Sequence, residues 1–361
     1  MTQDPGLASW LQLTLTPGLG AAAIRGLLKQ FGLPENVLCA TQAQLQRVAG
    51  PAAAALLRSD AIAPAVERTL RWAEVPGHAI VTLADAAYPK MLLQIPDPPP
   101  LLYCIGRLEL LDRPSLAIVG SRNATAQGVR NAEQFAQAFS AAGLTIVSGL
   151  ALGIDAAAHV GGLAAAGSTI AVLGTGVDVI YPRQNANLAQ RIGESGLLLS
   201  EFPLGTAGAA HHFPQRNRLI SALAQGCLVI EAALASGSLI TARAAAEQGR
   251  EVFAIPGSIH SPLSKGCHAL IKQGAKLVES AEDVLAELTA FRRTGYASTG
   301  AASAAPATDP LLAHLGFDPV DVDTLCARTG LAAEQIAAAL LRLELAGQVA
   351  ALPGGMYQRL D

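Results

Sequence analysis

Aromatic and charged residues are scarce in this chain. Phe, Trp and Tyr make up 4% of its 361 residues, and Asp, Glu, Lys and Arg make up 15%, against about 25% charged residues in a typical soluble domain. With 51% hydrophobic residues, the chain has ample apolar surface to bury, which excludes intrinsic disorder. The net charge of −3 disfavours indiscriminate binding of nucleic acid. Because residues 281–361 hold ten acidic and five basic residues, any polyanion must be bound by arginines in the middle of the chain.

Long apolar runs and paired cysteines are also missing. No window supplies the ~20 uninterrupted apolar residues that a membrane-spanning helix needs. The Met1–Pro5 segment has no basic region of the kind that begins a leader peptide. We therefore expect a cytoplasmic protein that has no leader and does not bind a membrane. The five cysteines stand singly, which excludes a zinc ribbon and a dithiol redox motif. His211 and His212 lack a metal-binding spacing. We therefore expect no metal and no cofactor.

Three nucleotide and catalytic motifs are absent. A Gly-Lys dipeptide never occurs, so there is no Walker A loop. Gly174-x-Gly176 has Val179 at the place of the third glycine of the dinucleotide fingerprint. No Gly-x-Ser-x-Gly elbow offers a nucleophile for acyl transfer. We expect no catalytic residues.

Residues 1–80 predict a helical domain of the helix-hairpin-helix or SAM-like type. The turn Pro17-Gly18-Leu19-Gly20 lies between two helical patterns, and in a helix-hairpin-helix such glycines let backbone N–H groups approach a DNA phosphate. Val48-Ala49-Gly50-Pro51 is a weaker second copy. A small helical bundle with a glycine-bearing turn explains the same pattern, so both alternatives stay open.

Residues 112–290 predict a Rossmann-like α/β domain with a doubly wound parallel sheet. Short apolar runs alternate with Ala-rich helical periodicity, which favours buried parallel strands covered on both faces. The runs are Leu116–Val119, Leu144–Val147, Thr169–Leu173, Leu197–Ser200, Leu228–Ile230, Val252–Ile255 and Lys276–Val278. The preceding residues 81–111 contain Ile95–Pro100, with four prolines in six residues, and predict an extended connector.

The C-terminal part divides into a linker and a small domain. Residues 291–309 contain almost no large apolar side chain and predict a flexible linker. Residues 310–361 show a helix, a turn, a helix and a Pro353-Gly354-Gly355 hairpin, the pattern of a winged helix. Its second helix carries Glu334 and Glu344 against Arg342. Because such a helix repels phosphates, we expect it to contact protein rather than DNA.

Ligands of a doubly wound sheet bind beyond the carboxyl ends of the strands. There the first predicted strand is followed by Gly120-Ser121-Arg122, whose guanidinium can bind a phosphate in a bidentate manner. Ser236-Gly237-Ser238 opens a predicted helix, Leu239–Gln248, whose free N–H groups and dipole suit a phosphate. Taken singly, each of these glycines is better explained by a strand-to-helix turn than by a ligand site.

Residues 211–218 combine an aromatic ring, an amide and two arginines in a predicted loop before a helix. Phe213 is suited to stack on an unpaired base while Arg216 and Arg218 hold the backbone, as in single-strand binding. The alternative is that Phe213-Pro214 is a hydrophobic staple for the following helix.

The strand ends and the helices after them also carry a distinctive set of segments. These are Ile118–Arg122, Val147–Asp155 with His159, Thr169–Gly174 with Tyr181-Pro182, Ser200-Glu201, Phe213–Arg218, Glu231, Ser236–Ala242 and Val252–Gly257. In this order they resemble the DNA processing protein A (DprA/Smf) family, which has a helical N-terminal domain and often a C-terminal winged helix.

The resemblance implies a bacterial protein that binds and protects single-stranded DNA, forms a homodimer through the Rossmann-like domain, and loads the RecA recombinase during natural transformation and recombination, without established catalytic activity. The residues implied for DNA binding are Gly120, Ser121, Arg122, Phe213, Arg216, Asn217, Arg218, Ser236 and Ser238, with Lys265 nearby. Two positions depart from the family pattern. Leu152 replaces a common basic residue, and Ala222 replaces a common glycine.

An enzyme is the alternative. A Rossmann-like sheet with Ser-Gly-Ser at a helix start also suits a nucleotide hydrolase of the lysine-decarboxylase-like (phosphoribohydrolase) class. Those enzymes carry Pro-Gly-Gly-x-Gly-Thr followed closely by Glu. Here Ser236-Gly237-Ser238 leads to Thr241-Ala242-Arg243, and Glu247 lies too far along the helix to substitute.

Overall fold

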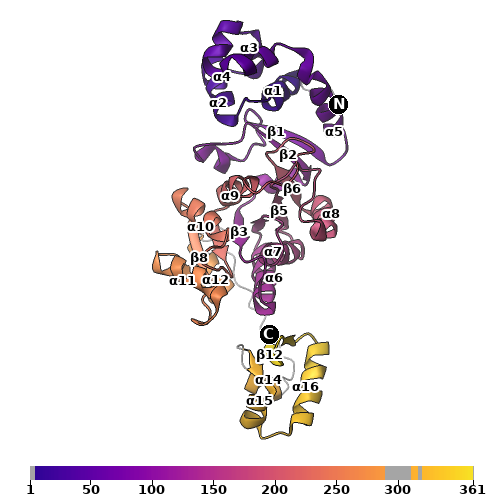
Figure 1. The fold of residues 1–361 in the computed structure, drawn as a ribbon, viewed down its shortest axis with the longest axis vertical. Helices are drawn as coiled ribbons and strands as arrows, with labels where there is room; N and C mark the ends of the chain where they lie inside the picture. The colour runs from indigo at the N-terminus through magenta and orange to yellow at the C-terminus, as the bar shows by residue number, and fades with distance from the viewer. Residues whose placement is uncertain (1–4, 289–309, 316–318, 361) are drawn as a thin grey trace.

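The computed structural model describes residues 5–288, 310–315 and 319–360. Figure 1 shows helices at the N-terminal end, a central α/β region and a small C-terminal unit. The predicted linker at residues 291–309 lies outside the described residues.

Six helices form the N-terminal part. They are α1 (Pro5–Leu15), α2 (Ala21–Phe31), α3 (Pro34–Cys39), α4 (Gln42–Leu57), the 3-10 helix η1 (Asp60–Ile62) and α5 (Ala63–Ala73). The predicted turn between the first two helices contains Gly18, whose φ of +81° requires glycine. Gly50, with φ of 80° and ψ of 164°, breaks the helical conformation inside α4. These helices bury a core of their own around Leu27, Leu45 and Leu57.

A nine-stranded mixed sheet forms the centre of the molecule, in the order β1-β2-β6-β5-β4-β3-β7-β8-β9. Its strands are β1 (His78–Thr82), β2 (Leu101–Gly106), β3 (Ser115–Val119), β4 (Thr145–Ser148), β5 (Thr169–Val172), β6 (Leu197–Ser200), β7 (Gly226–Val229), β8 (Glu251–Ala254) and β9 (Lys276–Leu277). The seven strands from β3 to β9 are mutually parallel, which confirms the predicted parallel α/β sheet.

Two strands at one edge correct the predicted organisation. β2 pairs antiparallel with β6, with Tyr103 opposite Ser200, and β1 pairs antiparallel with β2, with His78 opposite Ile105. Residues 81–111 are therefore an extended connector only in part, because they contribute β2 to the sheet. The prolines of Ile95–Pro100 lie in the segment before β2, where no ladder hydrogen bond is lost.

Helices cover both faces of the sheet. They are α6 (Ala126–Ala141), α7 (Ile154–Leu163), α8 (Ala186–Ser195), α9 (His212–Leu223), α10 (Ser238–Glu247), α11 (Lys265–Lys272) and α12 (Ala281–Glu287), with short 3-10 helices η2 (Lys90–Gln94), η3 (Leu108–Asp112), η4 (Arg183–Asn185) and η5 (Pro262–Ser264). Alternate strand residues point to opposite faces. Ala117 and Val119 pack with α9, α10 and α11, whereas Leu116 and Ile118 pack with α6, α7 and α12.

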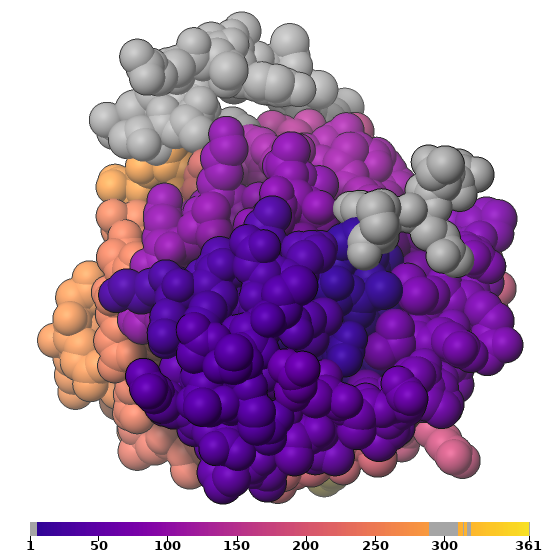
Figure 2. All heavy atoms as spheres, turned by 90° about the horizontal axis from the view of Figure 1, so that it is seen from above, coloured from indigo at the N-terminus to yellow at the C-terminus, as the bar shows by residue number. Residues whose placement is uncertain are grey.

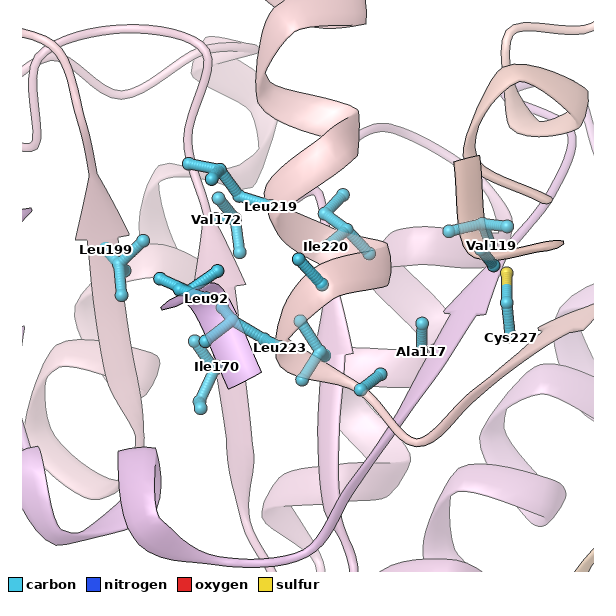
Figure 3. Packing of buried hydrophobic residues seen from close by; sticks show 14 of the residues in the cluster. Leu92, Ala117, Val119, Ile170, Val172, Leu199, Leu219, Ile220, Leu223 and Cys227 are labelled. Atoms are coloured by element: carbon cyan, nitrogen blue, oxygen red, sulfur yellow. The ribbon is translucent and has the colours of Figure 1, made fainter. Parts of the chain in front are cut away.

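Helix α9 is held on the sheet by apolar side chains. Figure 3 shows Leu219, Ile220 and Leu223 of this helix directed at Val172 and Ile170 of β5 and towards β3. All three side chains are at most 5% exposed. This packing fixes the rotation of α9 about its own axis, and so decides which of its polar residues face the carboxyl edge of the sheet.

The N-terminal helices contact the sheet region. Trp10 and Leu11 of α1 share an apolar cluster with Leu101 and Tyr103 of β2, and Arg25 Nη1 donates to the carbonyl oxygen of Pro98 at 3.1 Å. Seen from above, the N-terminal residues cover the middle of the molecule (Figure 2).

The C-terminal unit is a winged helix, as predicted. It contains α14 (Pro310–Leu315), β10 (Val320–Asp321), α15 (Val322–Thr329), α16 (Ala333–Leu345), β11 (Val349–Leu352) and β12 (Met356–Arg359), and its sheet has the order β10-β12-β11. Gly330 ends α15 in the left-handed conformation, with φ of 71°. A separate core includes Leu325, Ile336 and Leu340.

Candidate functional site

A pocket of about 810 Å³ opens at the carboxyl ends of the parallel strands. It lies where the strand order reverses, because β4 and β7 flank β3 on opposite sides, and such a switch point is the usual ligand site of a doubly wound sheet. The structure brings eight of the ten predicted residues to its lining: Gly120, Ser121, Arg122, Phe213, Arg216, Asn217, Ser236 and Ser238.

One face of helix α9 forms a wall of this pocket. The predicted loop at residues 211–218 is in fact largely helical, because α9 begins at His212. Phe213, Arg216, Asn217 and Ile220 all line the pocket. Their spacing of three, four and seven residues places them on a single helix face.

Arg216 forms the buried floor of the pocket. It is 4% exposed, and its Nη1 donates to the carbonyl oxygens of Gly149, at 2.6 Å, and Val172. A Cβ at position 149 would lie 2.2 Å from Nη1, so only glycine leaves room for the guanidinium. Burial lowers the pKa of Arg216 to about 10, partly offset by the nearby Asp155 carboxylate. Because it is buried and donates to two backbone carbonyl oxygens, the Arg216 guanidinium is held in one position.

Above this floor, three side chains form an aromatic and cationic array, in which Arg122 and Tyr181 are exposed and Phe213 is half-buried. Arg122 Cζ lies 5.6 Å from the centre of the Phe213 ring, and the Tyr181 ring lies 5.5 Å from the same ring at an angle of 40°. Phe213 packs against Gly174, where a Cβ would come within 2.9 Å of the ring. Tyr181 is 50% exposed. Tyr181 was not among the predicted site residues, although the scarcity of aromatic residues and the place of Tyr181 in the family pattern both pointed to it.

The Ser236-Gly237-Ser238 segment differs in detail from the prediction. Helix α10 begins at Ser238, but the amides of Leu239 and Ile240 already donate to the carbonyl oxygens of Ser236 and Gly237, each at 3.1 Å. The expected free N–H groups are therefore bonded at these two residues. The hydroxyls of Ser236 and Ser238, 2.7 Å apart, and the helix dipole remain to attract an anion.

The loop after β4 is locked in place beneath Arg122. Gly153 has φ of +75°, and a Cβ there would lie 2.3 Å from the Ser121 carbonyl oxygen. His159 is fully buried. Its Nδ1 lies 2.7 Å from Thr169 Oγ1, which donates to a carbonyl, and its Nε2 accepts from the Leu150 amide at 3.2 Å. Nδ1 therefore carries the proton, and burial lowers the pKa of His159 to about 3.

Glu231, two residues after the end of the neighbouring strand β7, supports the loop after β3. Its carboxylate accepts from the Thr125 hydroxyl at 2.5 Å and from the Thr125 amide at 2.9 Å. Thr125 in turn caps the start of α6. Glu231 is thus a positioning residue for the segment that contains Arg122.

Arg218 does not line the pocket, contrary to the prediction. Its guanidinium forms ion pairs with Asp97, at 3.0 Å, and with Glu201, and it donates to the Asp97 carbonyl oxygen at 2.9 Å. Burial raises the pKa of Glu201 to about 7, and the charge of Arg218 opposes that rise. Two residues along a helix correspond to a rotation of about 200°, so Arg218 points away from the side that carries Arg216.

The remaining predicted positions lie at the margins. Lys265 is the exposed first residue of α11 and is not part of the lining, although the nearby Leu263 is. Leu152 is 37% exposed. Ala222 is fully buried in the core with Leu219 and Ile220, so α9 packs on the sheet with a methyl group at this position.

Within the ranges that the structure describes, no cluster of three His, Cys, Asp or Glu side chains is arranged to hold a metal ion. Over the same ranges, every helix is too short or too polar to cross a membrane.

Comparisons with known proteins agree with this geometry. Residues 79–289 match the family model of DNA recombination-mediator protein A, and residues 297–355 match the DprA winged helix domain. Protein Smf of Escherichia coli (strain K12) is 45% identical over 304 residues, which are 82% of this chain and 81% of that protein.

The X-ray structure of DNA processing protein A from Streptococcus pneumoniae has a TM-score of 0.70 and 41% identity, covering 78% of this chain and 97% of that chain. DNA processing protein A from Helicobacter pylori, whose structure is described as showing a single-stranded DNA binding mode, has a TM-score of 0.53 and 32% identity, covering 58% of this chain and 96% of that chain.

Proposed function

Because the chain belongs to the DNA recombination-mediator protein A family, we propose that the pocket at the switch point of its sheet binds single-stranded DNA. In this proposal the protein protects incoming DNA and loads the RecA recombinase on it during natural transformation and recombination.

The observation that carries the proposal is the array of Arg122, Phe213 and Tyr181 above the buried Arg216. Aromatic rings stack on unpaired bases, and guanidinium groups bind the phosphates between them. A base within a duplex cannot reach these rings without unstacking, which costs a few kcal/mol. The pocket therefore favours a single strand.

The serines and glycines that line the pocket are also suited to a single strand of DNA. Ser121, Ser236 and Ser238 offer hydroxyl donors around the pocket, and Gly237 has no atom within 4 Å of a hypothetical Cβ. This open space allows a sugar–phosphate backbone to approach closely. Asn217 Nδ2 reaches the Gly237 carbonyl oxygen at 3.4 Å, linking α9 to this rim.

A homodimer through the Rossmann-like domain is part of the proposal. Strand β9 ends the sheet, with β8 as its sheet neighbour, and Leu277 on this strand is 43% exposed. An edge strand with an exposed leucine is suited to association with a second copy. The recombinase partner is inferred from the family and not from a particular surface.

We propose no catalytic activity. The family match does not favour the phosphoribohydrolase alternative. In addition, the carboxylate of Glu231, the acidic residue just after β7, already accepts two hydrogen bonds from Thr125. Incubation with nucleoside monophosphates tests the alternative, since release of free base would support an enzyme.

The proposal is tested by titrating the protein with matched single- and double-stranded oligonucleotides at two salt concentrations. We expect tighter binding of the single strand, with an affinity that falls as salt rises because counterions are released. Equal affinity for both forms, or no dependence on salt, would contradict the proposal.

A further inference from the structure

Strand β1 is an edge of the nine-stranded sheet. It pairs with β2 on one side, and among the described residues no strand lies on its other side. Figure 1 shows β1 beside the N-terminal helices. The backbone N–H and C=O groups on such an edge can pair with a further chain.

Two hydrogen bonds to the segment of β2 decide which residues of β1 face outward. The Gly106 amide donates to the Gly77 carbonyl oxygen at 2.8 Å, and the Leu83 amide donates to the Pro100 carbonyl oxygen at 3.1 Å. Bonded and non-bonded pairs alternate along an antiparallel ladder. The odd-numbered residues of this segment therefore bond to β2, and the even-numbered ones direct their N–H and C=O groups away from the sheet.

Among the outward residues, Ile80 keeps both of its backbone groups available. The His78 amide already donates to the Val75 carbonyl oxygen at 3.0 Å. The Thr82 amide donates to the Asp85 carboxylate at 2.6 Å, and the Thr82 carbonyl oxygen accepts from the Asp85 amide at 3.0 Å. Neither backbone group of Ile80 has a comparable partner within the described part of the chain. One donor and one acceptor are therefore free at the middle of the strand.

A groove of about 420 Å³ runs along this edge. Its lining includes the consecutive residues 80–82, whose side chains alternate between the two faces of the sheet, so the groove borders the edge of the strand rather than one face. Its walls include Leu7 and Trp10 of α1, Leu33 just before α3, and Leu108 of η3. Leu33 is 55% exposed. An apolar groove along an open edge suits an extended peptide whose alternate side chains enter it.

The charged side chains of this lining are both acidic. Glu35 lies in the first turn of α3 and is half-buried, and Asp85 carries the carboxylate that accepts from the Thr82 amide. A basic partner is attracted to this pair, whereas DNA phosphates are repelled. The groove shares no lining residue with the pocket at the switch point, so it is a separate site.

We propose that this groove binds an extended basic segment of another protein, which adds antiparallel to β1 and exchanges both backbone hydrogen bonds with Ile80. In strand addition, main-chain bonds supply affinity and pockets for alternate side chains supply specificity. One residue of an antiparallel partner takes up both groups of Ile80. A helical partner satisfies its own backbone groups and would leave those of Ile80 unpaired.

The first test titrates the full chain with two peptide pools. The peptides have an inner part as long as β1, five residues, drawn from Val, Ile and Thr, with lysine at both ends in one pool and glutamate in the other. Tryptophan fluorescence is the readout, because Trp10 lines the groove and the ring of Trp72, the second tryptophan of the chain, lies 4.4 Å from that of His78 on β1.

We expect a saturable change with the lysine pool and at least tenfold weaker binding of the glutamate pool. No saturable change with the lysine pool, or equal binding of the two pools, would overturn the proposal.

Backbone pairing is tested with the lysine pool N-methylated at every inner amide, which removes the donors but keeps the side chains. We expect this pool to bind at least tenfold more weakly than the unmodified one. We also expect saturation with unmodified peptide to slow hydrogen exchange of the Ile80 amide at least tenfold. Equal binding of the methylated pool, or unchanged exchange at Ile80, would show that no strand is added to β1.

A pair of matched variants tests the place of binding. Leu33→Arg puts a cation into the apolar wall, and Leu93→Arg is the control, because Leu93 is 53% exposed and lies outside the lining. We expect Leu33→Arg to weaken binding of the lysine pool at least tenfold and Leu93→Arg to leave it within twofold. Equal effects of the two substitutions, in proteins with unchanged circular dichroism spectra, would refute binding in this groove.

Discussion

Arg216 and Arg218 leave helix α9 in nearly opposite directions and have different partners. Arg216 reaches the carbonyl oxygen of Gly149 at the floor of the pocket, at 2.6 Å, whereas Arg218 reaches Asp97 and Glu201 on the other side of the helix. Arg216 lines the pocket that we propose binds DNA. Arg218 fastens the segment before β2 to α9.

Replacing Arg218 should therefore affect stability rather than DNA binding. Arg218→Ala leaves Glu201 buried without its partner, and breaking such a pair costs about 3–5 kcal/mol. Urea unfolding should show a loss of this size. The affinity of the folded variant for single-stranded DNA should stay within about twofold, and a large fall in affinity with unchanged stability would place Arg218 in the DNA site after all.

Arg122→Ala should have the reverse effect. Arg122 is exposed, so the loss of stability should stay below about 1 kcal/mol, the usual worth of an exposed cation–π contact. If Arg122 binds one phosphate, the slope of log affinity against log salt should become shallower by about 0.7. Fluorescence anisotropy at several salt concentrations measures this slope. An unchanged slope would remove Arg122 from the phosphate contacts.

Tyr181→Ala tests the second aromatic ring. Because Tyr181 is half-exposed, its loss should change the free energy of unfolding little, while loss of one stacked base should weaken single-strand binding by about 1–3 kcal/mol. Tyr181→Phe keeps the ring and is the control, with an expected affinity close to that of the original protein. Equal affinity of the alanine variant would show that no base stacks on this ring.

Alanine substitutions at Gly153 and Gly237 distinguish a glycine that is needed for the backbone conformation from one that is needed for contact with the ligand. Gly153→Ala forces a left-handed backbone and a 2.3 Å clash with the Ser121 carbonyl oxygen, so we expect a loss of at least about 2 kcal/mol in stability. Gly237 has no neighbour within 4 Å of the added methyl, so Gly237→Ala should unfold like the original protein. If DNA approaches this glycine closely, the same variant should bind single strands less tightly.

His159 should make stability depend on pH. Its pKa is about 3 in the folded protein and about 6.5 in the unfolded chain, so the unfolded chain binds more protons between these values. Its contribution is fully present above pH 6.5 and is lost as the pH falls towards 3. Between pH 7 and pH 5 this amounts to about 2 kcal/mol.

The measurement compares His159→Gln with the original protein by urea unfolding at these two pH values. The amide of glutamine preserves a donor and an acceptor but does not titrate. We expect the variant to lose about 2 kcal/mol less than the original protein on going from pH 7 to pH 5. Parallel losses in the two proteins would show that His159 does not carry this pH dependence.

Local sequence patterns predicted much of the α/β region. The runs around Leu116–Val119 and Thr169–Leu173 formed strands, because short continuous apolar runs between helices are typical of parallel strands buried on both faces. The edge strands β1 and β2 were missed. β2 joins the sheet by pairing with Ser200 and its neighbours, about a hundred residues away, and β1 joins it by pairing with β2.

The composition and order of the segments determined the family, the parallel sheet and the edge at which small residues and arginines gather, because these follow from short-range periodicity and from the chain direction of parallel strands. Only the tertiary structure decided which of these side chains meet. The start of α9 at His212 and its apolar contacts with β5 set the rotation of the helix. That rotation turns Arg216 inward and Arg218 away, and the fold brings Tyr181 beside Phe213, 32 positions further along the chain.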